Sequence, residues 1–173
     1  MATTFTRPNE ADWPVTLLAN VMKQYHPRLS DLEVRVGILM AYNADGPPVK
    51  HGGYPALAKI KPVPLKDRVT KGFDAELLID EQAWKELSKE TQAALLDHEL
   101  SHLSLVVKED ENGREIVQID DIGRPKLKTV PGDWNTGDGF REVVARHGEA
   151  SIEFENARKA HAYATAALAG EVG

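Results

Sequence analysis

The chain contains no cysteine among its 173 residues. This absence excludes disulfide bonds, thiolate metal sites and cysteine nucleophiles, and it leaves histidine and carboxylate side chains as the strong metal ligands. No stretch approaches the run of about 18 apolar residues that a membrane-spanning helix requires. The amino-terminal residues also lack the apolar segment of a signal peptide. We therefore expect a soluble protein without a membrane partner that stays inside the cell.

Positive charge is also scarce, since the chain has 21 Lys and Arg residues but 27 Asp and Glu residues, and its net charge is −6. Without a basic field, nucleic acid is not an expected partner. The lysines and arginine of residues 59–71 are more simply a solvated edge than a binding patch. With 42% hydrophobic residues, no internal repeat and no linker, residues 1–173 are expected to form a single domain.

Apolar periodicity predicts an α+β fold in which a small mixed sheet precedes the central helix and further helices follow it. The expected strands are residues 33–40, 73–79 and, within a loop-rich region at 42–72, residues 54–60. The expected helices are one closed by Pro27, one at 81–87, one beginning after Ser88, one at 140–147 and one at 149–168. A hairpin is expected to turn at 111–114, and Ile152 and Tyr163 are expected to anchor the last helix.

The helix that begins after Ser88 carries His98-Glu99-Leu100-Ser101-His102, an HExxH motif. At about 100° per residue, the two histidines lie one turn apart on the same face and can reach a single metal ion. Glu99 lies beside them, where it can polarise a metal-bound water rather than bind the metal.

The flanking residues favour the metal site over its alternative, an ordinary amphipathic helix with two exposed histidines. Leu96, Leu100 and Leu103 form an apolar stripe on the side away from the histidines. We therefore expect one face of the helix to enter the core and the other to present the motif.

A catalytic zinc ion usually has three protein ligands, and the third is expected downstream of the motif. Lys108 occupies the position at which an extended HExxH motif would place a third histidine. Asp138 and Glu142 are four residues apart, so they can share a helix face and are the candidate ligands. For each, the alternative is a surface or first-turn carboxylate. His147 is more simply a residue at a helix carboxyl end, although a transition-state donor is an alternative.

Residues 75–102, with a strand, a Trp-containing short helix and a Leu-rich helix ending in HExxH, resemble the phage metallopeptidase family. The segments 33–40 and 140–148 fit the same pattern, and through that family the chain more distantly resembles the SprT-like zincin proteases. The resemblance implies a zincin-like domain, a phage protein and a location in the cytoplasm of a bacterial host. The sequence departs from the family pattern at residues 133–138, where a metal-binding histidine would be expected and none is present.

The leading hypothesis is a zinc-dependent endopeptidase that acts on a protein or peptide substrate. His98 and His102 would bind Zn²⁺, Asp138 or Glu142 would complete the site, and Glu99 would act as the general base. By resemblance, an extended substrate would pair with the strand at 73–79 or 54–60. The alternative is a catalytically weak or inactive metal-binding module that acts by protein–protein binding in a phage or host setting. A nucleic-acid-associated protease is a third possibility that the acidic composition disfavours.

Overall fold

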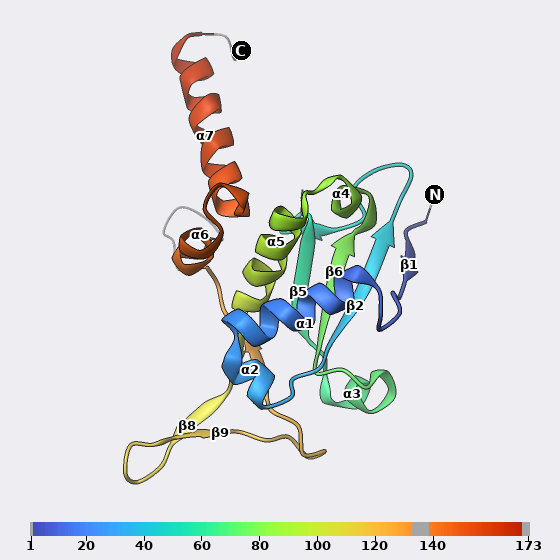
Figure 1. Ribbon diagram of the computed structural model, residues 1–173, viewed down its shortest axis with the longest axis vertical. Helices are drawn as coiled ribbons and strands as arrows, with labels where there is room; N and C mark the ends of the chain where they lie inside the picture. The colour runs from blue at the N-terminus through green and yellow to red at the C-terminus, as the bar shows by residue number, and fades with distance from the viewer. Residues whose placement is uncertain (1, 133–138, 171–173) are drawn as a thin grey trace.

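The computed structural model describes residues 2–132 and 139–170 (Figure 1). Its strands are β1 (Thr4–Thr6), β2 (Val36–Tyr42), β3 (Lys50–His51), β4 (Tyr54–Pro55), β5 (Ala58–Pro62), β6 (Ala75–Asp80), β7 (Leu103–Leu105), β8 (Val107–Glu109), β9 (Glu115–Val117) and β10 (Leu127–Thr129). Its α-helices are α1 (Trp13–Tyr25), α2 (Pro27–Asp31), α3 (Leu65–Lys71), α4 (Glu81–Glu86), α5 (Lys89–Ser101), α6 (Arg141–His147) and α7 (Ile152–Leu168).

Four strands form a mixed sheet in the order β1-β2-β6-β5. β2 and β6 are parallel, whereas β1 and β5 run antiparallel to their neighbours. Alternate residues of β6, namely Ala75, Leu77 and Ile79, are fully buried, as their period-two pattern predicts. The predicted small mixed sheet that precedes the HExxH helix is confirmed.

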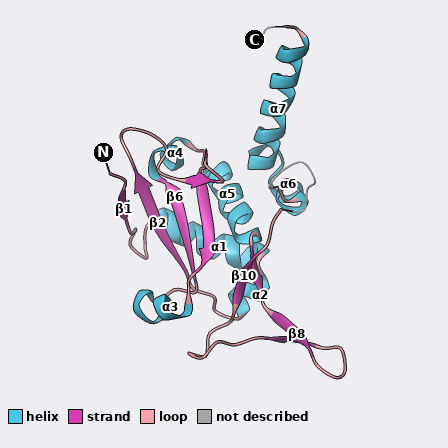
Figure 2. Ribbon diagram, turned by 180° about the vertical axis from the view of Figure 1, so that it is seen from behind, coloured by secondary structure: helices cyan, strands magenta, loops and turns pink. Residues whose placement is uncertain are grey.

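Helices α1 and α5 lie against one face of this sheet, and the view from behind shows the strands in front of α1 (Figure 2). The core forms between these two layers. Its largest fully buried side chains include Leu77 and Ile79 of the sheet and Leu95, Leu96 and Leu100 of α5. Burial of this apolar surface is the main favourable term that fixes α5 against the sheet.

Helix α5 is buried on the side of the motif as well as on the side of its leucines. Leu96 and Leu100 are fully buried as expected, but His98, Glu99 and His102 are only 7%, 5% and 8% exposed. The face that presents the motif is therefore buried as well, and the alternative of an amphipathic helix with two exposed histidines is excluded. The physical reason is tertiary, because β5, α6 and the first turn of α7 pack around that face.

After α5 the chain forms two antiparallel ribbons. β7 pairs with β10, and β8 pairs with β9 in the predicted hairpin. Gly113 in the hairpin turn has a φ of 76°, a left-handed conformation that glycine adopts without a steric penalty.

Other segments differ from the sequence-based expectation. The region interpreted as loop-rich contains α3, which begins after Pro64 and ends at Gly72, whose φ is 73°. Helix α7 begins three residues later than expected, because Ser151 caps it by accepting a hydrogen bond from the Phe154 N–H. The expected anchor Tyr163 is 65% exposed, since α7 projects away from the sheet and α5 (Figure 1).

Within the described residues, no helix is both long enough and apolar enough to span a lipid bilayer.

Candidate metal centre

The two motif histidines meet at the carboxyl end of α5. Ser88 caps the helix by accepting a hydrogen bond from the Thr91 N–H, and His102 stands at its carboxyl end. Because the histidines are one helical turn apart, their rings lie side by side with centroids 5.0 Å apart. Their Nε2 atoms are separated by 3.3 Å.

The outer nitrogen of each ring is held by an oxygen that can only accept a hydrogen bond. His98 Nδ1 lies 2.7 Å from Glu153 Oε1, and His102 Nδ1 lies 2.8 Å from the carbonyl oxygen of Val130. Each Nδ1 therefore donates a hydrogen bond to its oxygen, and Nε2 is the nitrogen of each ring that lies toward the other histidine.

This spacing fits zinc. With Zn–N distances of about 2.0–2.1 Å and tetrahedral angles, two nitrogen ligands of one zinc ion lie about 3.3–3.4 Å apart. The observed 3.3 Å between the Nε2 atoms matches that separation. The donor chemistry also fits, because each ring has the outer hydrogen bond that orients zinc-binding histidines.

Glu99 is fixed beside the outer edge of the sheet. Its Oε2 accepts a hydrogen bond of 3.0 Å from the backbone N–H of Ile60 in β5. β5 is the last strand of the sheet and hydrogen-bonds to β6 on its other side. The carboxylate of Glu99 is therefore held between the histidine pair's helix and an edge strand.

Of the two candidate third ligands, Asp138 and Glu142, the structure describes only Glu142. Asp138 lies outside the described residues. Glu142 is exposed in the first turn of α6, and the described part of the chain contains no group of three or more metal-binding side chains. The adjacent Phe140, however, packs its ring against both His98 and His102, with centroid distances of 5.4 and 4.7 Å. The segment that leads into α6 therefore reaches the histidine pair.

Sequence reasoning missed Asp97, a fully buried carboxylate directly before His98. It accepts hydrogen bonds from His26 at 2.7 Å, from Arg146 at 2.8 and 3.1 Å, and from His147 at 2.9 Å. Burial raises the pKa of this carboxyl group, but the hydrogen bonds from His26 and Arg146 outweigh burial and hold the pKa below its usual value. His147 at the end of α6 is thus hydrogen-bonded to Asp97 of α5. Since these partners are 49 to 71 residues away along the chain, no local pattern indicates the cluster.

Sequence reasoning also missed Glu153, which is 3% exposed and lies in the first turn of α7. Besides His98, the backbone N–H of Phe140 donates to its Oε1 at 3.1 Å. Burial opposes ionisation of Glu153, but the hydrogen bond from His98 prevails and lowers the pKa of the carboxyl group. An acidic residue in a first helical turn is common, so the sequence alone does not distinguish Glu153 from a residue that interacts with the helix dipole.

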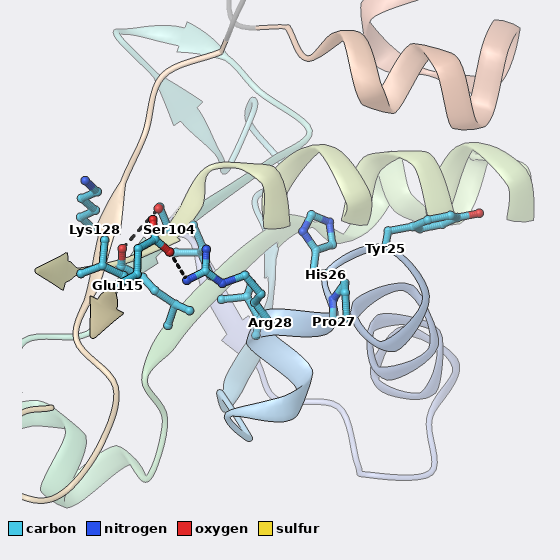
Figure 3. A pocket seen from close by; sticks show the side chains of 11 residues that line it. Tyr25, His26, Pro27, Arg28, Ser104, Glu115 and Lys128 are labelled. Carbon is cyan, nitrogen blue, oxygen red and sulfur yellow. Dashed lines mark hydrogen bonds and ion pairs between the residues drawn. The ribbon is translucent and has the colours of Figure 1, made fainter. Parts of the chain in front are cut away.

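A pocket of about 390 Å³ lies on another part of the surface, between the corner joining α1 to α2 and the strands that follow α5 (Figure 3). Tyr25, His26 and Arg28 line one side, and Glu115 and Lys128 line the other. The three key residues of the HExxH motif do not line it. This pocket is therefore separate from the candidate metal centre.

A family model described as "Putative phage metallopeptidase" matches residues 10–165, and the chain belongs to this family. The match includes strands β2, β5 and β6 of the sheet, α5 and the first turn of α7. Membership supports a metal-dependent peptidase as the general class and a protein or peptide as the class of substrate. Comparisons with curated proteins and with solved structures find no match.

Proposed function

We propose that the protein is a zinc-dependent endopeptidase with its active centre at the carboxyl end of α5. The observation that carries this proposal is the 3.3 Å separation of two Nε2 atoms whose rings both hold their proton on Nδ1. His98 and His102 would bind the metal through these nitrogens. The metallopeptidase family to which the chain belongs supports the same chemistry.

Glu99 is the proposed general base. A bound zinc ion would polarise the scissile carbonyl and acidify water. Glu99 takes the proton from the attacking water and delivers it to the leaving amine. Its hydrogen bond from the Ile60 N–H fixes the orientation of the carboxylate.

Strand β5 is the proposed docking edge for an extended substrate. The other strand considered, at residues 73–79, is less suited to this role, because β6 already hydrogen-bonds to β2 and β5 on its two sides. The Ile60 N–H points to Glu99 rather than to β6, so the outer edge of β5 runs beside the proposed base. A substrate strand paired there would bring its backbone carbonyl groups close to Glu99.

The third ligand is proposed to be a carboxylate from Asp138 or Glu142. Proximity along the chain to Phe140, whose ring contacts both histidines, favours this segment. Exposure of Glu142 makes Asp138 the preferred candidate of the two. Asp138→Asn and Glu142→Gln test the choice, and the variant that binds zinc more weakly identifies the ligand.

The central experiment measures zinc stoichiometry by mass spectrometry and cleavage of a peptide library. Wild type should bind one zinc ion and cleave peptides, whereas His98→Ala and His102→Ala should lose zinc. Glu99→Gln should retain zinc and lose about 10²- to 10⁴-fold in rate, the usual contribution of a general base. His161→Ala, an exposed histidine of α7, is the matched control and should behave as wild type. Failure of the wild type to bind supplied zinc would refute the proposal, and undiminished cleavage by Glu99→Gln would refute the assigned base.

A second candidate function is a metal-binding module with little or no catalytic activity that acts by binding another protein. It is favoured by one observation, namely that the sequence has no histidine between His102 and His147 to serve as a third ligand. X-ray absorption spectroscopy of the zinc-loaded protein separates the two functions. Four protein ligands without a water, together with no cleavage of any library peptide, would support the binding module.

A further inference from the structure

Glu153 occupies an unusual position for a carboxylate. It belongs to the first turn of α7, is 3% exposed, and contacts a histidine 55 residues earlier in the chain. Ser151, which is also buried, caps that turn and fixes its geometry. The cap by Ser151 therefore fixes the carboxylate of Glu153 at hydrogen-bond distance from His98.

The geometry excludes Glu153 as a ligand of the same ion. Its Oε1 is 2.7 Å from His98 Nδ1, whereas the nitrogen that faces His102 is Nε2, on the other side of the imidazole ring. Glu153 can therefore act on a metal only through His98. By accepting the Nδ1 proton it fixes the tautomer and the orientation of the ring, and it makes Nε2 a stronger donor to a cation.

The two oxygens of Glu153 differ in their contacts, because both of its side-chain hydrogen bonds are made by Oε1. Its Oε2 is buried without a hydrogen-bond partner in the described structure, and among the described residues its ion-pair partner is His98. A buried oxygen without a hydrogen-bond partner costs free energy, and such a cost is typical of side chains that serve a site rather than stability alone.

Glu153 also connects the metal centre to the start of α6. The same Oε1 accepts a hydrogen bond of 3.1 Å from the N–H of Phe140, whose ring packs on both histidines. One carboxylate oxygen therefore joins α7, the beginning of α6 and a motif histidine of α5. A shift of the first turn of α7 would therefore move the oxygen that orients the His98 ring.

We propose that Glu153 is a positioning residue of the metal centre, and that docking of the first turn of α7 and metal binding are coupled. This inference rests on the proposed zinc site at His98 and His102. Because the two equilibria are linked, docking of this turn should raise the zinc affinity by the same factor by which zinc stabilises the docked turn. The C-terminal helix is then part of the metal centre, although most of its length projects away from it (Figure 1).

The test compares Glu153→Gln with Glu155→Gln in the full chain. Both variants neutralise one glutamate of α7, but Glu155 is at the surface, where it pairs with Arg158. Zinc affinity is measured by competition with a chromophoric chelator. Glu153→Gln should bind zinc about 10- to 100-fold more weakly than wild type, as expected for loss of a carboxylate behind a histidine ligand, and Glu155→Gln should not differ from wild type. Glu153→Asp retains the charge and should recover part of the affinity.

Two further measurements separate positioning from a purely structural role. In the metal-free wild type, ¹⁵N nuclear magnetic resonance should show His98 protonated on Nδ1, and Glu153→Gln should lose this preference. Zinc should also slow amide hydrogen exchange in the first turn of α7 in wild type, with a smaller effect in Glu153→Gln.

Each outcome decides a separate point. A wild type that binds no zinc overturns both the proposed function and this inference. A wild type that binds zinc no more tightly than Glu153→Gln leaves the proposed function intact and overturns the inference alone. A His98 protonated on Nε2 in the metal-free wild type overturns it as well, and this result does not depend on any variant folding correctly.

Discussion

Replacement of Asp97 by asparagine tests whether the buried charge cluster holds α5, α6 and the end of α1 together. Asp97 is fully buried and accepts four hydrogen bonds from His26, Arg146 and His147. Asparagine has nearly the same shape, but its amide nitrogen would face donors that can no longer be satisfied. The substitution therefore isolates the charge and the acceptor capacity of Asp97 from its packing.

The expected loss follows from the surroundings of the three donors. Removing one partner of a buried ion pair costs about 3–5 kcal/mol, because the other partner stays buried without compensation. The Arg146 side chain is 27% exposed and can be partly rehydrated. We therefore expect Asp97→Asn to lower the free energy of unfolding by about 2–4 kcal/mol, somewhat less than a wholly buried pair would give.

Urea unfolding at pH 7, followed by circular dichroism, measures this loss. With a slope of about 2 kcal/mol per molar urea, the midpoint should fall by about 1–2 M. Asp31→Asn, the same change at an exposed position in α2, is the control and should shift stability by no more than about 0.5 kcal/mol. A loss below about 1 kcal/mol for Asp97→Asn would show that the cluster does not stabilise the packing of these helices.

Three further predictions concern other parts of the fold. Burial raises the pKa of Asp74, but the hydrogen bond and charge of Arg124 outweigh burial and lower this pKa. The carboxylate therefore stabilises the fold above about pH 4, and this contribution disappears as the pH falls through the folded pKa. The stability difference between wild type and Asp74→Asn should accordingly narrow below about pH 4 in acid titrations; a constant difference would contradict this. Gly37→Ala should lose about 1–3 kcal/mol in urea unfolding, because a Cβ would clash with the Phe73 ring, and an unchanged midpoint would refute the close contact. Arg28→Ala should change stability by less than about 1 kcal/mol, because its ion pair is exposed, and a larger loss would mean that the pocket wall is structurally important.

The sequence alone predicted the elements whose signals are local. The alternation of Ala75, Leu77 and Ile79 indicated a strand, and Ser88 marked the start of the helix that carries the motif. The spacing of His98 and His102 placed both rings on one helix face, since helix geometry depends only on residue number. The α+β class is confirmed for the same reason. These features arise from backbone periodicity and capping, which neighbouring residues determine.

Tertiary structure decided the features that depend on contacts between distant parts of the chain. It buried the motif face beneath β5, α6 and α7, because the helix is packed from both sides rather than one. It placed β5 at the outer edge of the sheet and β6 between two neighbouring strands.

The charged groups around the motif show the same division. Asp97 and Glu153 look in the sequence like ordinary helix carboxylates, and each acquires its role from partners about 50 residues away. The HExxH spacing determined that two imidazoles can converge. Only the folded chain decided which nitrogen of each imidazole carries the proton, because Glu153 and Val130 reach the rings solely through packing of segments that follow the motif.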